Sequence, residues 1–334
     1  MKCAAITGIL GQDGTYLARW LLHQGYAVHG LLRLPFDREE ARVRRRFPAA
    51  QIRAIQWHTG SLTDPFALLR FLQTAQPTEL YHLAGVSDSR QSFVIPEETL
   101  ASITLGTLRL LEAARAACPA ARIFLASSAE VFGAPAETPQ CESTLRQPAT
   151  PYGIAKLAAD QLGRLHRTHY QQFVVSGILY NHESPLRPAN YLSRRVAQAV
   201  AAIKAGRARE LELADLSAAR DWSDARDVVR GYQLALQAPA PADYIFASGR
   251  QHQVAELVDR AFRTADLDYR EFVRVTDRTS NTQQVVNGLR GNPARAETEL
   301  GWRRNWTFIR TIEDMVRAEL EARPELERAD PLWQ

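Results

Sequence analysis

Short apolar runs alternate with amphipathic stretches along the first half of the chain. The runs are rich in β-branched or aromatic residues and end in Gly, Ser or a polar residue: CAAITG, YAVHGLL, IRAIQW, ELYHLAG and RIFLASS. Between them, YLARWLLHQG and LGTLRLLEAARAA carry apolar residues at three- and four-residue steps, the period of a helix. This alternation predicts an α/β fold with a doubly wound parallel sheet, covered by helices on both faces.

The second half of the chain is less regular. QFVVSGILYN predicts another buried strand and ADYIFASG a late one, whereas HESPLRPANY is a proline-rich loop. Helices are expected over residues 189–205, 253–264 and 308–322. We therefore expect residues 1–180 to form the main domain. Residues 181–330 should form mainly a smaller C-terminal lobe, with some segments returning to the main sheet.

Composition restricts the class of protein. The chain has 334 residues, of which 46% are hydrophobic and 23% charged, as in an ordinary soluble globular protein of one large or two unequal domains. The net charge is +4, but the basic residues are scattered among 37 acidic ones and form no nucleic-acid motif. We therefore expect pockets for phosphate-bearing small molecules and no nucleic-acid partner.

Cysteine and histidine usage argues against disulfides and metal. Cys3, Cys118 and Cys141 are odd in number and widely spaced, as reduced thiols of a cytoplasmic protein are. The N-terminus shows no signal peptide, and no apolar run reaches the roughly 18 residues of a membrane span. His166 and His169 have no third ligand nearby and are interpreted as exposed helix residues. We expect a cytoplasmic protein with no metal and no membrane partner.

The motif ITGILGQDG places Gly8, Gly11 and Gly14 between a predicted strand and a predicted helix. Such a turn lets the backbone approach a pyrophosphate and presents amide groups at a helix N-terminus. The position directly after the first strand is the context that makes this weak pattern informative. It predicts a dinucleotide site that also includes Gln12 and Asp13.

The end of the second predicted strand bears on the choice between NAD and NADP. An NAD site usually has Asp or Glu there, about 20 residues beyond the glycines, to bind the ribose 2′-hydroxyl. This chain has Leu32 and Arg33 instead. Because an arginine suits a 2′-phosphate and no carboxylate repels it, NADP is favoured over NAD.

A catalytic centre is predicted where the strand FLASSAEVFG ends. That end carries Ser127, Ser128 and Glu130, and Tyr152 and Lys156 follow at helical i, i+4 spacing. A nearby ammonium lowers the pKa of a phenol, so Tyr152 could exchange a proton with a substrate hydroxyl during hydride transfer. A hydride transfer alone does not need Glu130.

These motifs together resemble the extended short-chain dehydrogenase/reductase superfamily, whose members act on nucleotide sugars. Several segments between residues 3 and 303 are similar to signatures of the GDP-mannose 4,6-dehydratase family: ITGILGQDGTYLA, VHGLLR, SSAEVFG, PYGIAKL, GILYNHESPLRP, ARDWSDARDVV and GNPARAETELGW. GQDG and NHESP are the most diagnostic. The resemblance implies a Rossmann-type, mainly NADP-binding domain over 1–180 and a mainly nucleotide-sugar-binding lobe over 181–330.

The resemblance also implies an activity, a lyase reaction that removes water from a sugar nucleotide, most favourably GDP-mannose. Hydride would pass from C4 to NADP and back to C6. Tyr152 would take the O4 proton, and Ser128 would hydrogen-bond O4. Glu130 would remove the C5 hydrogen and help the C6 hydroxyl to leave. Lys156 would support Tyr152 and the nicotinamide ribose.

Other site residues follow from the same resemblance. The further cofactor residues are Ser61, Leu62, Leu83, Ala84 and Ser127. The expected substrate residues are Ser87, Asn181, Arg187, Arg194, Arg195 and Arg220. A homodimer or homotetramer is expected, since such proteins commonly dimerise through the helix that carries Tyr152.

Two departures leave the substrate open. Thr282 stands where the family has an arginine on the diphosphate, and Val285 where it has a carboxylate. The nucleotide sugar could therefore differ from GDP-mannose. An NADPH-dependent reductase or C4 epimerase of a 4-keto-6-deoxy sugar, a nucleotide-sugar decarboxylase and a silent NADP-binding scaffold remain as alternatives.

Overall fold

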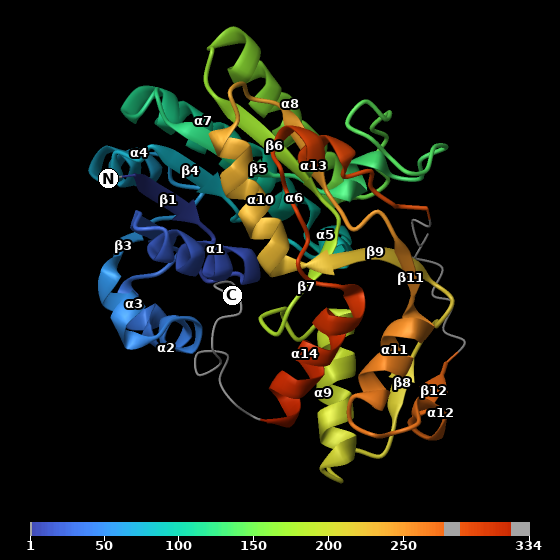
Figure 1. Cartoon of the computed structure of the whole chain (residues 1–334). Coiled ribbons are helices and arrows are strands. Elements are labelled where there is room, and N and C mark those ends of the chain that lie inside the picture. The colour runs from blue at the N-terminus through green and yellow to red at the C-terminus, as the bar shows by residue number, and fades with distance from the viewer. Residues whose placement is uncertain (1, 277–287, 322–334) are drawn as a thin grey trace.

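A seven-stranded parallel sheet forms the centre of the computed structural model, which describes residues 2–276 and 288–321 (Figure 1). The strand order is β10-β6-β5-β4-β1-β2-β3. The strands are β1 Cys3–Thr7, β2 Ala27–Leu32, β3 Ile55–Thr59, β4 Glu79–His82, β5 Arg122–Ala126, β6 Val174–Leu179 and β10 Asp243–Phe246. The chain order reverses between β1 and β4, and doubly wound sheets bind ligands beyond the carboxyl ends of the strands at such a point. The predicted fold class is confirmed.

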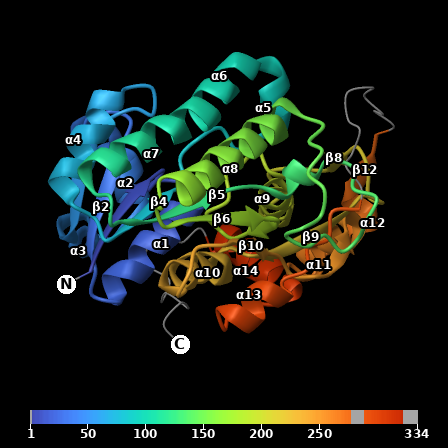
Figure 2. The same ribbon diagram turned by 90° about the horizontal axis from the view of Figure 1, so that it is seen from above.

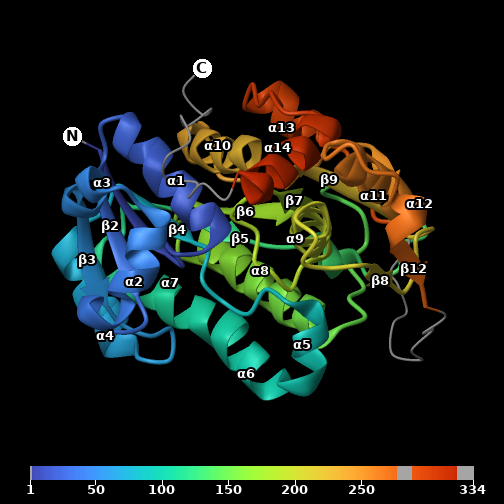
Figure 3. The ribbon, with the colours of Figure 1, turned by 90° about the horizontal axis from the view of Figure 1, so that it is seen from below.

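Helices cover both faces of this sheet (Figures 2 and 3). One face carries α1 Gln12–His23, α10 Ala225–Gln237 and α13 Ala294–Glu299. The other carries α4 Pro65–Ala75, α7 Gly106–Ala117 and α8 Pro151–His169. Each face has its own buried core, one around Tyr16 and Tyr232 and the other around Leu111 and Ile123. Burial on both faces explains why the strands read as short, continuous apolar runs.

Shorter elements connect these layers. Two helices lead from β2 to β3, α2 Phe36–Arg46 and α3 Ala49–Ala54. A chain of turns precedes α7, namely α5 Ser89–Val94, α6 Pro96–Leu100 and a π-helical turn over Ala101–Leu105. A 3₁₀ turn, Ala129–Phe132, follows β5 directly. The α5 turn and the 3₁₀ turn bring polar side chains to the carboxyl edge of the sheet.

A smaller lobe stands beyond that edge, at the lower right of Figure 1. Its core lies between α9 Leu192–Lys204, α11 Val254–Arg263 and α14 Phe308–Leu320. Short strands complete it: β7 Asn181–Glu183, β9 Ala219–Asp224 and β11 Gln251–Gln253 form one sheet, β8 Leu211–Leu213 pairs with β12 Val273–Val275, and α12 Tyr269–Phe272 precedes β12. The three helices predicted in this half are present, within about two residues at most ends.

The sequence prediction for His166 is wrong. His166, expected to be exposed on its helix, is 1% exposed, and its Nδ1 lies 2.6 Å from the Gln172 amide oxygen. Its Nε2 lies 3.4 Å from Glu112 of α7, so it packs between helix and loop. His169, on the same helix, is exposed.

Within residues 2–276 and 288–321, none of the helices combines the length and apolar character that crossing a bilayer requires.

Candidate active site

The turn from β1 into α1 leaves no room for side chains at Gly8 and Gly14. Gly8 has a φ of +73°, and a Cβ added there would lie 2.8 Å from the Ala84 backbone nitrogen. A Cβ added at Gly14 would lie 2.3 Å from the Gly8 carbonyl oxygen. Helix α1 begins directly after Gly11, and the first amide groups of a helix have no intrahelical partner. The turn therefore fits the pyrophosphate of a dinucleotide.

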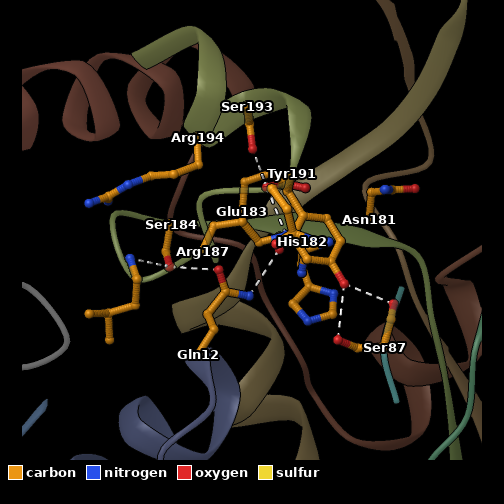
Figure 4. A network of polar contacts seen from close by, with 12 residues as sticks. Gln12, Ser87, Asn181, His182, Glu183, Ser184, Arg187, Tyr191, Ser193 and Arg194 are labelled. Carbon is orange, nitrogen blue, oxygen red and sulfur yellow. Dashed lines mark hydrogen bonds and ion pairs between the residues drawn. The ribbon is translucent and has the colours of Figure 1, made fainter. Parts of the chain in front are cut away.

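The side chains of Gln12 and Asp13 bind another part of the chain (Figure 4 shows Gln12). Gln12 donates to the His182 carbonyl oxygen at 3.1 Å and accepts a hydrogen bond from Ser184 at 2.8 Å. Asp13 accepts from His182, and from the Tyr232 hydroxyl at 2.7 Å. The GQDG and NHES motifs are thus joined by hydrogen bonds. A cofactor could therefore contact the backbone of Gln12 and Asp13, but not their side chains.

The remaining predicted cofactor residues follow the carboxyl ends of neighbouring strands. They are Arg33 after β2, Ser61 and Leu62 after β3, Leu83 and Ala84 after β4, and Ser127 after β5. Arg33 is exposed, as a group that meets a ligand phosphate must be. Because the strands are parallel, all six lie at the carboxyl edge of the sheet.

Helix α8 carries Tyr152 and Lys156 against the end of β5. Thr150 caps the start of the helix, and its hydroxyl oxygen accepts a hydrogen bond from the Gly153 amide at 2.9 Å. Lys156 donates through Nζ to the Ala126 carbonyl oxygen at 2.7 Å, and Nζ lies 5.7 Å from the centre of the Tyr152 ring. Burial lowers the pKa of Lys156 to about 8.

The pKa of Tyr152 departs from the sequence expectation. Burial raises it well above its ordinary value, and the negative charge of Glu130 raises it further. The Ser128 side chain and the charge of Arg187 oppose this rise. The expected lowering by Lys156 is therefore not what this structure shows, because the desolvation of a fully enclosed phenol outweighs the neighbouring cations.

Glu130 lies in the 3₁₀ turn after β5 and faces the same site. Ser128 caps that turn and accepts a hydrogen bond from the Glu130 amide at 3.2 Å. The Glu130 carboxylate accepts from Ser89 at 2.6 Å and from Thr150 at 2.9 Å. Burial raises its pKa, while these two bonds and the charge of Arg220 limit the rise. A carboxyl group with a raised pKa is suited to accepting and returning a proton.

A buried ion network beneath Lys156 was missed by the sequence reasoning. Asp160 accepts from Ser127 at 2.6 Å and pairs with Arg146 at 3.1 Å. Arg146 also binds Asp243, at 3.0 Å, at the start of β10. Burial raises the pKa of Asp160 to about 6, and its charge raises the pKa of Lys156. The spacing of four residues after Lys156 was the available signal.

Some of the predicted substrate residues lie close together around Tyr191 (Figure 4). Tyr191 donates to the Ser87 carbonyl oxygen at 2.8 Å, and Arg187 stacks 3.8 Å above the Tyr191 ring. Arg187 also pairs with Glu183, and its charge reaches Tyr152. Asn181 is exposed at the start of β7.

The other predicted arginines differ in their surroundings. Arg220, on β9, interacts electrostatically with Glu130. Arg194 points away from Tyr191 in Figure 4, binds the Pro185 carbonyl and pairs with Glu319 of α14 at 2.5 Å. Arg195 is exposed on α9. The structure thus brings Arg187 and Arg220 to the catalytic centre and engages Arg194 with the lobe itself.

Thr282 and Val285 lie outside the described residues, so the structure does not bear on them. In the part of the chain that is described, no group of three His, Cys, Asp or Glu side chains is arranged to hold a metal ion.

Comparison with known proteins gives consistent matches over nearly the whole chain. A family model described as GDP-mannose 4,6 dehydratase matches residues 5–315. The chain is 35% identical to GDP-mannose 4,6 dehydratase 2 of Caenorhabditis elegans, with 99% of this chain and 91% of that protein covered. It is 37% identical to GDP-mannose 4,6-dehydratase of Sinorhizobium fredii, with 96% and 97% covered.

Solved structures share the fold at lower identity. RMD from Pseudomonas aeruginosa, solved with NADPH, superposes with a TM-score of 0.77 at 24% identity, covering 96% of this chain and 99% of that one. UDP-glucose 4-epimerase of Thermus thermophilus, solved with NAD, gives a TM-score of 0.81 at 21% identity, covering 96% and 99%.

Proposed function

The chain belongs to the GDP-mannose 4,6-dehydratase family, and from that premise we propose that it removes water from GDP-mannose to give GDP-4-keto-6-deoxymannose, with NADP as internal hydride carrier. One observation carries the proposal beyond the family name. Glu130, a carboxylate whose pKa burial raises, stands beside Tyr152 and Lys156 in one centre. A hydride transfer alone uses the last two, whereas an elimination also needs a base for C5.

NADP is the cofactor of the proposal. The glycine turn of Gly8, Gly11 and Gly14 fits its pyrophosphate, and the exposed Arg33 beyond β2 suits its 2′-phosphate. Lys156 would hold the nicotinamide ribose. When bound, NADP supplies the hydride acceptor for C4 of the sugar and the hydride donor for C6.

The first half of the proposed reaction oxidises the C4 hydroxyl group to a ketone. Tyr152 takes the O4 proton, while Ser128 donates a hydrogen bond to the same oxygen. Lys156 is protonated below a pH of about 8, the value to which burial lowers its pKa. The charge of Arg187 favours the phenolate form that Tyr152 needs in order to take the O4 proton. Protonated Lys156, whose Nζ lies 5.7 Å from the centre of the Tyr152 ring, adds a second positive charge to the site.

The second half eliminates water and restores the cofactor. The C4 ketone acidifies the C5 hydrogen, which Glu130 removes as a proton. The C5–H electron pair forms a C5=C6 double bond as the C6–O bond breaks, and the departing hydroxide takes the proton from Glu130. Glu130 would then take up a proton from solvent and pass it to C5 as hydride returns to C6, while Tyr152 releases the O4 proton to solvent. Over the cycle the sugar loses one water.

We assign the two lobes corresponding roles. Residues 1–180 would mainly bind NADP, and residues 181–330 the nucleotide sugar, with β10 joining the main sheet. For the diphosphate we propose Arg187, Arg195 and Arg220, together with Ser87 and Asn181 around the sugar. Arg194 would contact the diphosphate only after leaving its ion pair with Glu319.

We further propose a homodimer formed through α8, the helix that carries Tyr152. Large apolar side chains stand exposed on α8 and on the adjacent turns, including Ile154 and Leu165 on α8 itself. Two copies facing each other there would bury these side chains. A cytoplasmic location suits the three cysteines, all of which are free thiols.

The test is incubation of the purified protein, supplied with NADP, with GDP-mannose and a panel of other nucleotide sugars, followed by mass spectrometry. Loss of one water from GDP-mannose, without net change in NADPH absorbance, supports the proposal. Turnover of a 4-keto sugar only when NADPH is supplied would instead identify a reductase. NADP binding without binding of GDP in a calorimetric titration would indicate the silent scaffold.

A further inference from the structure

Two hydroxyl groups bind the same oxygen of the Glu130 carboxylate. Ser89 Oγ donates to Oε2 at 2.6 Å, and Thr150 Oγ1 donates to Oε2 at 2.9 Å. Neither of these contacts uses Oε1. Resting on the proposed dehydration, we propose that Ser89 is a positioning residue that orients Glu130, so that Oε1 is the oxygen that removes the C5 proton.

Both donors are held by the ends of helices rather than by flexible loops. Ser89 is the first residue of α5, which Asp88 caps by accepting from the Arg90 amide at 2.9 Å. Thr150 caps α8, and its oxygen accepts from the Gly153 amide at 2.9 Å. The Thr150 oxygen thus accepts from the helix backbone while its hydroxyl proton is donated to Glu130.

The α5 turn also holds the backbone of Tyr152, the residue that acts together with Glu130 in the proposed reaction. Ser92 Oγ accepts a hydrogen bond from the Tyr152 amide at 3.1 Å and donates to the Ser89 carbonyl oxygen at 2.6 Å. Ser92 is fully buried. One turn thus sets the carboxylate of Glu130 and the backbone of Tyr152 relative to each other, which matters because both act on the same sugar ring.

The same contact influences when Glu130 is ionised. Burial raises its pKa, and hydrogen bonds from Ser89 and Thr150 and the charge of Arg220 oppose that rise, whereas the charge of Asp88 adds to it. Tyr152 also faces the carboxylate, since the charge of Glu130 raises the pKa of Tyr152. A variant without the Ser89 hydroxyl should therefore have a Glu130 that takes up its proton at higher pH.

The elimination is the step that should respond. In it the C5–H pair becomes the C5=C6 double bond, the proton goes to Oε1, and it leaves with the C6 oxygen as water. A carboxylate free to rotate would offer either oxygen and would spend less time aligned with C5. Removal of the O4 proton and of the C4 hydride uses Tyr152 and Lys156 and should be little affected.

The experiment compares Ser89→Ala, Ser89→Thr and wild-type protein, each loaded with NADP and mixed rapidly with GDP-mannose. In Ser89→Ala, the rise in NADPH absorbance should stay within about twofold of wild type, while water loss slows about ten- to hundredfold, as expected for one hydrogen bond to a charged group. Reduced cofactor should then accumulate transiently. The acid limb of the elimination rate should move to higher pH, and Ser89→Thr should restore both.

A second measurement avoids the hydride steps altogether. The isolated 4-keto-6-deoxy product is incubated with each variant in deuterium oxide, and uptake of deuterium at C5 is followed by mass spectrometry. Ser89→Ala should slow this exchange by the same factor as the elimination. Ser102→Ala is the matched control, since Ser102 donates at 3.3 Å to the Thr99 carbonyl within the neighbouring helical turns.

The possible failures are distinguishable. Wild-type protein that releases no water overturns the proposed function, and this inference with it. Wild-type protein that dehydrates, together with a Ser89→Ala variant that slows hydride removal and elimination equally or neither of them, overturns the inference alone. Failure of Ser89→Thr to recover, with folding intact by circular dichroism, also overturns it.

Discussion

His182 holds Asp13 through Nε2, which lies 3.0 Å from each oxygen of the Asp13 carboxylate. The other ring nitrogen, Nδ1, lies 2.7 Å from the Tyr180 carbonyl oxygen. Both partners can only accept, so both ring nitrogens donate and the imidazole is protonated. Burial lowers the pKa of His182, but the charge and hydrogen bonds of Asp13 outweigh burial and raise it. The pair joins the glycine turn to the start of the smaller lobe.

This ion pair predicts that stability falls as pH rises above neutrality. The pKa of His182 is raised from 6.5 in the folded state, so its contribution is complete below 6.5 and is lost as the pH rises through the folded value. The pKa of Asp13 is lowered from 3.8, although burial alone would raise it, so its contribution is lost only in acid. The free energy of unfolding should therefore decline as the pH rises above 6.5.

The measurement is denaturant unfolding at a series of pH values. His182→Gln should be less stable than wild type at pH 6 by about 3–5 kcal/mol, because Asp13 is left buried without its cation. It should also lose the alkaline decline. His169→Gln, on an exposed site, should keep it. An unchanged pH dependence in His182→Gln would contradict the assignment.

Glu130→Gln should separate the two halves of the proposed reaction. Glutamine keeps the shape and can still accept hydrogen bonds from Ser89 and Thr150, but it cannot take a proton. General base catalysis contributes about 10²–10⁴-fold, so water loss should fall by that factor while hydride removal from C4 continues. NADPH absorbance should rise and persist. Loss of hydride removal itself would mean that Glu130 acts earlier than proposed.

Asp160 should determine the pH at which the rate of hydride transfer begins to decline on the alkaline side of its pH profile. Its negative charge raises the pKa of Lys156, which burial lowers to about 8. In Asp160→Asn, Lys156 should therefore lose its proton at lower pH, and the rate of C4 hydride removal should decline from a lower pH than in wild type. The pH profile of the NADPH transient measures this. Asp259→Asn, on α11 of the smaller lobe, should leave the profile unchanged, and an identical shift there would count against a local effect.

Local sequence patterns predicted the features that depend on residues close together in the chain. These features are the glycine turn, the succession of parallel strands from β1 to β6, and the pair of Tyr152 and Lys156. The contact of Ser89 with Glu130 spans 41 residues in the chain and links a turn to the end of a strand. No periodicity reports such a contact. Strands of three residues, such as β8 and β11, are likewise too short to show a period of two.

The burial of polar and titratable side chains was also mispredicted from the sequence. His166 was expected to be exposed because no third metal ligand is visible near it and His169, yet it is buried and contacts Gln172 and Glu112. For Tyr152 the sequence shows the nearby ammonium but not the desolvation that raises the pKa of the phenol. Both quantities depend on which distant segments cover a side chain.

Arg33 should determine the preference for NADP over NAD. It is exposed just beyond β2, where a guanidinium can bind the 2′-phosphate with two hydrogen bonds. Arg33→Ala should weaken NADP binding about ten- to hundredfold, because a charged hydrogen bond is lost, and should leave NAD binding nearly unchanged. Calorimetric titration with both cofactors measures the ratio. Arg164→Ala, an exposed arginine on α8, is the control, and equal weakening of both cofactors would contradict the role.

The apolar face of α8 should set the oligomeric state. Ile154 is 50% exposed and Leu165 is 48% exposed on that helix, and Ile309 is 50% exposed on α14 in the other lobe. Burying a charge at an apolar contact is costly, so Ile154→Glu and Leu165→Glu should shift a dimer to a monomer in sedimentation experiments. Ile309→Glu introduces the same charge at equal exposure and should leave the dimer intact. A wild-type monomer would refute the proposed assembly, and dissociation by Ile309→Glu would move the contact to the other lobe.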